Sequence, residues 1–333
     1  MNKVKEKISF KARIKSTFDT PRKRQKFAKK CLMFVVHTVK YIFLIGISFI
    51  ILYPLLLQLA VAFREPSDIN NPTVLWIPEK FSLDNFKIAI TALNYKDALT
   101  TTFMNSLIVT IFQVLSTSFA GYAFARLKFK GSKILFGLAI FTVIVPQTMV
   151  SLPMYIDFAQ KGMLGKKYIL FLMAALGMGI KSGIFIYLFR QFFKGIPVEL
   201  EESAYLDGCN PFGVFFKIML PNARSCIITV AILSFVWQWN DYYFTNLFYV
   251  SGQVDVYTLA TQLQSITSGS ALQSALMAAN IWQLMGEDVT SNPLFVSMIV
   301  NTAGILVMLP VLIIYTFVQK LFVEGVERSG IVG

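Results

Sequence analysis

Acidic and small residues gather in one short segment, 196–208, in the second half of the chain. The segment reads Ile-Pro-Val-Glu-Leu-Glu-Glu-Ser-Ala-Tyr-Leu-Asp-Gly, and Ile-Met-Leu-Pro follows at 218–221. Residues 199–206 are good helix formers, and acids in a first turn complement the helix dipole. Gly208 permits a backbone turn that a β-carbon would resist. The segment therefore predicts a short acidic helix that ends in a turn.

The residues after this turn favour a binding surface rather than a catalytic site. Val214, Phe215 and Ile218 recur at the spacing of one helix face, which predicts an apolar side for a partner. Glu202 and Asp207 are able to pair with basic groups across such an interface. The alternative interpretation is an ordinary amphipathic connector with a solvated acidic face.

A second group of residues with chemical potential surrounds Asp241. An acid inside or near an apolar span is costly, which makes it a functional candidate. Aromatic rings stack on sugar rings and polar side chains satisfy sugar hydroxyls, so we predict a sugar path at Trp237, Trp239, Asn240, Asp241 and Tyr243. The alternative is an interfacial aromatic belt with helix packing.

Two further positions are candidates for functional residues within apolar stretches. Lys181 lies among the glycines of 177–183, which could break a helix or let it pack closely, and its alternative roles are snorkelling or a satisfied ion pair. Gln147 follows Pro146, and the prolines of this stretch could expose carbonyls to a cavity or simply kink the helix. An unbroken helix from Ser225 would place Asp241 about 24 Å along its axis, towards the outer side of a membrane.

Catalytic and metal-binding arrangements are missing from the sequence. There is one histidine, His37, and the three cysteines, Cys31, Cys209 and Cys226, have no metal-ligand spacing. Segment 162–167 lacks the glycine spacing and the Ser/Thr of a phosphate loop. An embedded enzyme would need a histidine pair or a nucleophile elbow, and an ion channel would show a charged ring or a filter repeat. We therefore expect no metal, no cofactor and no ATP hydrolysis on this chain.

The composition and the apolar runs predict the helices that position these residues. The 333 residues are 55% hydrophobic and 15% charged, whereas a soluble domain is about a quarter charged. Apolar runs long enough to cross a bilayer, about 20 residues each, predict an all-α polytopic membrane protein with six spans. The predicted spans are 41–63, 103–124, 134–156, 170–193, 225–248 and 294–319, and 271–286 is predicted as an extramembrane amphipathic helix.

The charge distribution predicts the orientation of these spans. The net charge is +13, and residues 1–40 hold 13 Lys/Arg against two acids, so the excess belongs to the N-terminal tail. Placing both termini inside puts 23 basic residues on the inner side and seven on the outer. We interpret 1–40 as a basic cytoplasmic tail against anionic lipid. A partner-docking or nucleic-acid arm is the alternative, and with no regularly interleaved aromatics we expect no nucleic acid.

The acidic segment, extended to 196–221, resembles the EAA loop of bacterial ABC importer permeases. That loop has Glu-Ala-Ala, three residues, Gly, nine residues, and Ile-x-Leu-Pro. The matching positions, with Ser203 in place of the usual Ala, are Glu202, Ser203, Ala204, Asp207, Gly208, Ile218, Leu220 and Pro221. Stretches 105–107, 122–131, 239–241 and 322–325 resemble the carbohydrate-uptake class. Over 41–333 the chain resembles the smaller permease subunit of maltose-type, binding-protein-dependent importers.

This resemblance implies a fold, a set of partners and a mechanism. The fold is that of type I ABC importer permeases in the bacterial cytoplasmic membrane, with two short loop helices that meet at a bend and dock into a cytoplasmic ATPase. The implied partners are a second homologous permease, an ATPase dimer that binds ATP and Mg, and an extracellular sugar-binding protein. The implied function is alternating-access import of a carbohydrate, favoured as an oligosaccharide, with a non-sugar solute as the alternative. We expect the outer loop, 249–293, to contact the binding protein with its helix partly buried there, or else to cap the spans.

Overall fold

The computed structural model describes residues 21–65, 78, 80–249, 257–268, 270–278 and 292–330. Within these ranges the chain is helical, and the extended backbone is limited to an isolated bridge between Arg64 and Phe81. The all-α prediction is confirmed for this part of the chain. The chain divides into two compact units, residues 1–60 and residues 61–333.

The first unit is dominated by one long helix, α2 (Pro21–Ala62). Its 42 residues include most of the predicted first span, 41–63, and also the second half of the basic tail. Residue 40 is therefore not a structural boundary, because the helix runs through it. Apolar side chains are exposed along the helix, among them Ile45 and Ile50.

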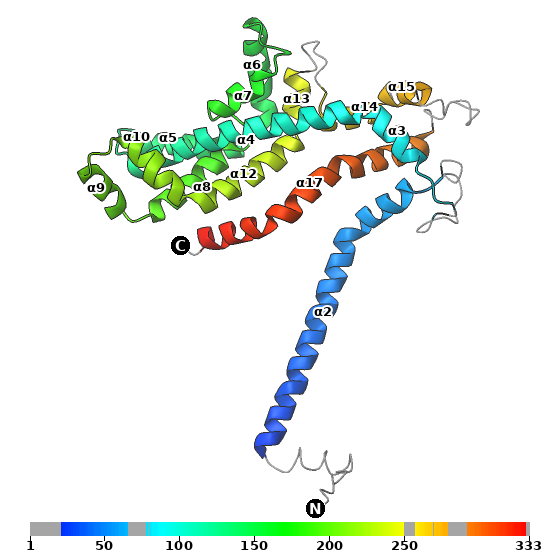
Figure 1. Ribbon diagram of the computed structural model, residues 1–333, viewed down its shortest axis with the longest axis horizontal. Helices are drawn as coiled ribbons and strands as arrows, with labels where there is room; N and C mark the ends of the chain where they lie inside the picture. The colour runs from blue at the N-terminus through cyan, green and yellow to red at the C-terminus, as the bar shows by residue number, and fades with distance from the viewer. Residues whose placement is uncertain are drawn as a thin grey trace, which may run out of the picture. The chain divides into compact units, whose positions relative to one another are not determined.

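The second unit is built around α4 (Tyr95–Arg126), which packs along α8 (Ser182–Gly195) and α12 (Arg224–Trp239) (Figure 1). The last helix, α17 (Pro293–Gly330), packs along α12. Gly121 allows α4 and α8 to approach closely, since a β-carbon there would lie 2.5 Å from Cβ of Phe189. The same holds for Gly183 in α8, where a β-carbon would lie 2.5 Å from the Ala139 carbonyl of α5 (Ser132–Ile144).

Three predicted spans are interrupted in the structure. Breaks at Pro146 and among the glycines of 177–183 were possibilities that the sequence raised, whereas the unbroken helix expected from Ser225 to Asp241 is wrong. Pro146 separates α5 from α6 (Gln147–Gln160), and their axes differ by 103°. The 170–193 segment forms α7 (Tyr168–Ala175) and α8, with Gly177 and Lys181 in the left-handed region between them. In the 225–248 segment, α12 ends at Trp239, and three residues separate it from α13 (Tyr243–Phe248).

Helices outside the predicted spans form a core with the start of α17. These are α3 (Asp84–Ala92), α14 (Leu259–Thr267) and α15 (Ser270–Ala278). The helix predicted at 271–286 is present as α15 up to residue 278, and the rest lies outside the described residues. Its Leu272 and Leu276 are fully buried in this core, which also contains Ile88 and Phe295.

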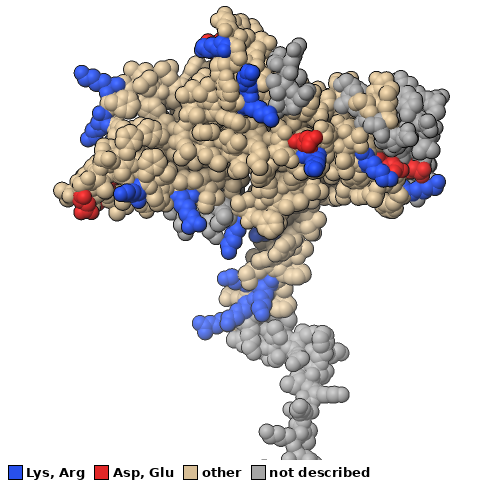
Figure 2. Space-filling model, turned by 45° about the horizontal axis from the view of Figure 1, so that its top comes forward, with Lys and Arg blue, Asp and Glu red and all other residues tan. Residues whose placement is uncertain are grey.

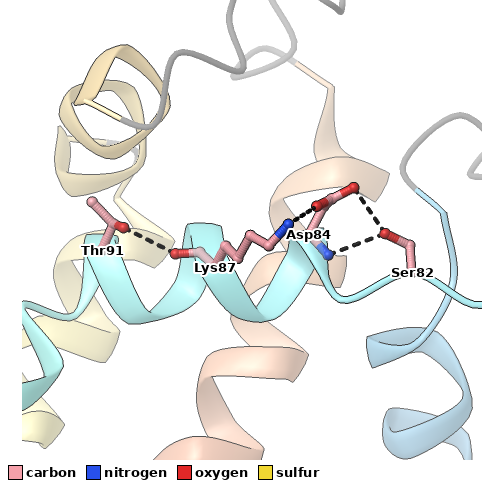
Figure 3. Close-up of polar contacts among 4 residues, drawn as sticks. All are labelled: Ser82, Asp84, Lys87 and Thr91. Carbon is pink, nitrogen blue, oxygen red and sulfur yellow. Dashed lines mark hydrogen bonds and ion pairs between the residues drawn. The ribbon is translucent and has the colours of Figure 1, made fainter.

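The start of α3 is held by a local polar group (Figure 3). The Ser82 hydroxyl donates to Asp84 Oδ2 at 2.9 Å and accepts the Asp84 N–H at 3.0 Å. Lys87 Nζ lies 2.8 Å from Asp84 Oδ1, one turn along the helix. Burial is slight here, and the pKa of Asp84 is held below its usual value mainly by the hydrogen bond from Lys87 and then by that from Ser82.

Some of the described helices are long and apolar enough to cross a membrane. Three helices qualify alone: Gln25–Ala62, Tyr95–Arg126 and Pro293–Lys320. The number rises to five if each of two bent pairs counts as one span, namely α5 with α6, and Pro211–Asn222 with α12, which bend by 103° and 79°. Figure 2 shows a face made mostly of uncharged residues, as a lipid-embedded protein requires.

Candidate functional site

The predicted acidic segment folds as two short helices that meet at Gly208. The first, α9 (Glu199–Leu206), ends in a Schellman motif, in which the Cys209 N–H donates to the Ala204 carbonyl at 3.0 Å. The Gly208 N–H donates to the Tyr205 carbonyl, also at 3.0 Å. This motif needs a left-handed residue after the helix, and Gly208 has φ +80°. The predicted turn at Gly208 is confirmed.

The second helix begins at an Asn-Pro pair that the sequence interpretation overlooked. Asn210 caps α10 (Pro211–Val214) by accepting the Gly213 N–H at 2.6 Å, and Pro211 needs no partner for its nitrogen in the first turn. The helix continues as the π-helix η2 (Phe215–Met219) and as α11 (Leu220–Asn222). Pro221 lacks the N–H that an α-helix would bond four residues back, and a widened turn lies just before it.

Burial along this pair of helices reverses one prediction. Val214 and Phe215 were expected to face a partner, but both are buried in the chain's own core together with Ala204 and Phe193. That expectation is wrong because α9 and α10 fold back so that this face packs against α8 and the end of α4. The most exposed large apolar residues of the two helices are instead Leu206, at 88%, and Phe212 and Phe216, at 61% and 52%.

The acidic residues of α9 divide between solvent and the interior. Glu199, Glu202 and Asp207 are exposed, whereas Glu201 is buried. Glu201 Oε1 lies 2.7 Å from Nε of Arg126, the last residue of α4. Burial raises the pKa of Glu201, and the nearby Arg126 and then the Tyr122 hydroxyl act in the opposite direction. Sequence reasoning did not single out this ion pair.

The eight residues predicted for ATPase coupling lie together at one end of the second unit, around α9 and α10 (Figure 1). Five of them are exposed, Ala204 is buried, and the other two are half-buried. The exposed positions are Glu202, Ser203, Asp207, Gly208 and Pro221, and the half-buried ones are Ile218 and Leu220.

This geometry can be compared with known proteins. Residues 113–328, which include the whole helix pair, match the family described as "Binding-protein-dependent transport system inner membrane component". The chain belongs to this family. It is therefore a membrane component of a transport system, a permease, and the resemblance stated from the sequence is confirmed. Its relatives are transporter subunits rather than enzymes.

Named relatives of the permease belong to polysaccharide-related transport systems. The "Probable starch degradation products transport system permease protein AmyC" of Thermoanaerobacterium thermosulfurigenes is 33% identical over 219 residues, 64% of this chain and 77% of that protein. The arabinooligosaccharides transport system permease protein AraQ of Halalkalibacterium halodurans is 26% identical over 86% of this chain and 93% of its own length. YtcP of Bacillus subtilis, a polygalacturonan/rhamnogalacturonan transport system permease protein, is 28% identical over 88% and 96%.

A solved structure shares the fold of the permease. A chain of a bacterial ABC transporter involved in the import of the acidic polysaccharide alginate aligns with a TM-score of 0.59. The alignment covers 86% of this chain and 96% of that chain at 19% sequence identity. At this identity the similarity establishes the fold and nothing finer.

In the permease, Asp241 lies at a helix start rather than inside a continuous span. Its Oδ1 accepts the Phe244 N–H at 3.1 Å, and its Oδ2 accepts the Thr245 N–H at 3.0 Å and the Thr245 hydroxyl at 2.9 Å. The carboxylate therefore caps α13. The assumption of an unbroken helix from Ser225 to Asp241 is wrong, since α12 ends at Trp239.

The neighbouring aromatic residues point into the protein. Trp239 is buried, and its indole N–H donates to the Val307 carbonyl of α17 at 3.1 Å. Trp237 is half-buried and stacks on Phe185 of α8, with ring centroids 5.3 Å apart. Both rings make packing contacts inside the chain, as the packing alternative expects, and the buried Trp239 is the more enclosed of the two.

The remaining path candidates lie at three separate helix ends. Tyr243 in α13 pairs its hydroxyl with that of Ser151 in α6 at 2.6 Å. Asn240 directly follows α12, and its side chain donates to the Val236 carbonyl at 2.8 Å. Lys181 is exposed at the α7–α8 break, and the half-buried Gln147 is the first residue of α6.

A buried glutamine beside the α7–α8 break was missed from the sequence. Gln113 in α4 donates to the Ile180 carbonyl at 2.6 Å and to the Ser182 hydroxyl at 3.2 Å. It also accepts from the Ser234 hydroxyl of α12 at 2.8 Å. The Gln113 amide thus supplies a hydrogen bond to a backbone carbonyl at the helix break and links α4 to α8 and α12. A lone Gln within the apolar 103–124 run was the available signal.

Proposed function

We propose that this permease is the membrane subunit of an ABC importer for oligosaccharides and that α9 and α10 dock onto its cytoplasmic ATPase. The observation that carries the proposal is the exposed surface formed by Leu206, Phe212 and Phe216. Large apolar groups rarely stay in water without a partner. The exposed Glu202 and Asp207 beside them supply charges that basic residues of a partner would meet. ATP and Mg would bind to that partner.

The proposal includes six membrane crossings with both termini in the cytoplasm. The α7 and α8 helices, with 8 and 14 residues, together rise about 33 Å, which suffices for one broken crossing. The 42 residues of α2 rise about 63 Å, roughly twice the hydrocarbon thickness. Its N-terminal turns, with exposed Lys26, Lys29 and Lys30, would therefore extend through the anionic headgroup layer.

The substrate class follows from the names of the relatives. Those names include starch degradation products, arabinooligosaccharides and polygalacturonan, which share a sugar-chain character but differ in charge. We propose a second homologous permease and an extracellular sugar-binding protein as the other partners. The second permease would complete the path, since Trp237 and Trp239 are engaged inside this chain. Alternating access would then follow from rigid-body rocking of the two subunits.

Capture of the ATPase tests the docking surface. We expect the wild-type permease to co-purify with an ATPase, and the Leu206→Asp and Phe212→Asp variants to lose it, because a charge replaces an exposed apolar contact. Leu83→Asp is the matched control, since Leu83 is 60% exposed beside α3, away from the helix pair. Equal capture by all variants would show that the surface serves another purpose.

Motion transmitted through the loop is tested at Gly208. Gly208→Ile places a β-branched residue at φ +80°, where the side chain has room but the backbone is strained. Gly131 is a matched control, because its φ is +85° and its β-carbon position is equally open. We expect uptake per ATP hydrolysed to fall in Gly208→Ile and to stay unchanged in Gly131→Ile, measured with maltotriose, arabinotriose and trigalacturonate as probes. Transport of none of the three would argue against the oligosaccharide class.

The outer loop is proposed to meet the binding protein through the exposed side of α14 and α15. The apolar side of α15, with Leu272 and Leu276, is buried in this chain's own core, so only its opposite side is available to a partner. Met277, exposed on the same helix, remains available. Met277→Lys should raise the dissociation constant for the binding protein, and an unchanged constant would restrict α14 and α15 to capping the spans.

A further inference from the structure

One buried ion pair joins the helix pair to the rest of the permease. The described residues form four ion pairs, and in three of them the side chains are substantially exposed. Arg126 and Glu201 differ, with side chains only 11% and 9% exposed and their charged atoms 2.7 Å apart. Two charges removed from water in this way are costly to separate, because each would remain buried without its counterion.

The guanidinium of Arg126 contacts two elements at once. Besides Glu201 in α9, its Nη2 donates to the carbonyl of Ile196, the residue that follows α8. A planar guanidinium presents several donors in a fixed geometry, which suits this double contact. Arg190 of α8 strengthens the same region, since its Nε donates to the Phe124 carbonyl of α4 at 3.2 Å.

The position of Glu201 on α9 separates it from its acidic neighbours. Glu201 and Ala204, three residues apart, are the buried residues of this helix, so they share its inner face. Glu199 and Glu202 face solvent on the other sides. The Tyr122 ring, near the charged pair, packs against Phe215 with centroids 5.2 Å apart. Tyr122 thus links the surroundings of the pair to the aromatic core beneath the two helices.

We propose that Arg126 and Glu201 are positioning residues that fix α9 to the inner ends of α4 and α8, so that these three helices move as one body. The proposal rests on the proposed docking of α9 onto an ATPase. A movement of α9 away from α4 would separate the two buried charges, and this adds a cost to the loss of packing contacts. If the ATPase displaces α9, then α4 and α8 would therefore move by the same amount, because the segment between α8 and α9 would not absorb the movement.

Spin-label distances in the whole importer test this joint without a substrate. Labels would be attached at two exposed positions outside the predicted coupling residues, Leu200 in α9 and Gln191 in α8. The complex would be measured without nucleotide and with Mg-ATP trapped by vanadate. With the joint intact, we expect one narrow distance distribution that is the same in both states. A distribution that is broad or that shifts on trapping would overturn the proposal.

The decisive variant replaces both charges by apolar groups, Arg126→Met with Glu201→Leu. Such a replacement preserves packing and is often neutral for stability, so a merely structural role would be satisfied by it. We expect this variant to capture the ATPase but to lose the single narrow distance. A distribution as narrow as that of the wild type would show that apolar packing is enough and would refute the joint.

Two further variants keep the test interpretable. Glu199→Gln removes the same type of charge from the exposed side of α9 and should leave the distribution narrow. Arg126→Lys retains a cation for Glu201 but lacks the fork that also reaches Ile196, so an intermediate width is expected even if the double variant does not fold. Failure of the wild-type permease to capture an ATPase would instead refute the proposed function. Normal capture with unchanged distances in every variant would refute only the joint.

Discussion

Two buried carboxylates, Glu201 and Asp241, differ in what balances their charge. Their exposures are similar, 7% and 8%. Glu201 faces Arg126 from another helix, whereas Asp241 accepts hydrogen bonds from the first turn of α13, which follows it directly in the chain. A helix N-terminus offers oriented N–H groups and a partial positive charge. A neutral hydrogen-bond acceptor satisfies most of this requirement, and a full negative charge is not needed. Glu201 therefore depends on a distant residue, and Asp241 on its own neighbours.

The largest effect is expected when one member of the ion pair is removed. Glu201→Leu leaves the Arg126 guanidinium buried without a counterion, which should cost about 3–5 kcal/mol of unfolding free energy. The additional change Arg126→Met should recover most of this loss, since no charge then remains. Thermal unfolding of the detergent-solubilised complex would measure both variants. A single variant as stable as the double one would mean that water reaches Arg126.

A smaller and graded effect is expected at Asp241. Asp241→Leu removes every acceptor from the start of α13 and should cost about 1–2 kcal/mol, whereas Asp241→Asn keeps a capping oxygen and should cost a few tenths. Sugar uptake should decline in the same order, because α13 also holds Tyr243 against α6. Uptake that falls sharply in Asp241→Asn, with stability unchanged, would instead support a direct sugar contact.

The two carboxylates also show how far sequence reasoning reached. Composition and apolar runs were sufficient for the all-α membrane class, and the spacing from Glu202 to Pro221 was sufficient for the family. The turn at Gly208 was predictable because a backbone requirement is local. The number of membrane crossings was harder to predict from the sequence. Three continuous apolar segments are interrupted in the structure, at Pro146, Gly177 and Asn240.

Residues that act through distant partners were the hardest to find. Arg126 lies 75 positions before Glu201, and nothing local marks either as buried. The available signal was the spacing from Glu201 to Ala204, which places this acid on the packed face of α9. Asp241 was noticed because an acid in an apolar run is costly, but its partners depend on where α12 ends. Hydropathy does not contain that information.

The stability of the permease should depend on pH through the protonated and ionised forms of Glu201. Burial raises the pKa of this carboxyl above its usual 4.5, so the folded permease binds its proton more readily than the unfolded chain does. Stability from this group is complete below the unfolded pKa and is lost as the pH rises through the folded pKa. We therefore expect its contribution to the unfolding midpoint to fall as the pH rises above 4.5. Glu201→Gln should lack this component, and an identical profile in the variant would exclude Glu201 as its source.

The smallest effect is expected for an ion pair of nearly the same length at the surface. Lys87 and Asp84 in α3 are 2.8 Å apart, against 2.7 Å for Arg126 and Glu201, but their side chains are 69% and 45% exposed. Water solvates both charges after separation, so Lys87→Ala should cost only about 0.3 kcal/mol. Salt should weaken this contribution further, because exposed charges are screened. Unfolding midpoints of Lys87→Ala and the wild type, compared at low and high ionic strength, would measure it. A loss comparable to that of Glu201→Leu would mean that burial is not what separates the two pairs, and that the length of the ion pair decides its strength in this permease.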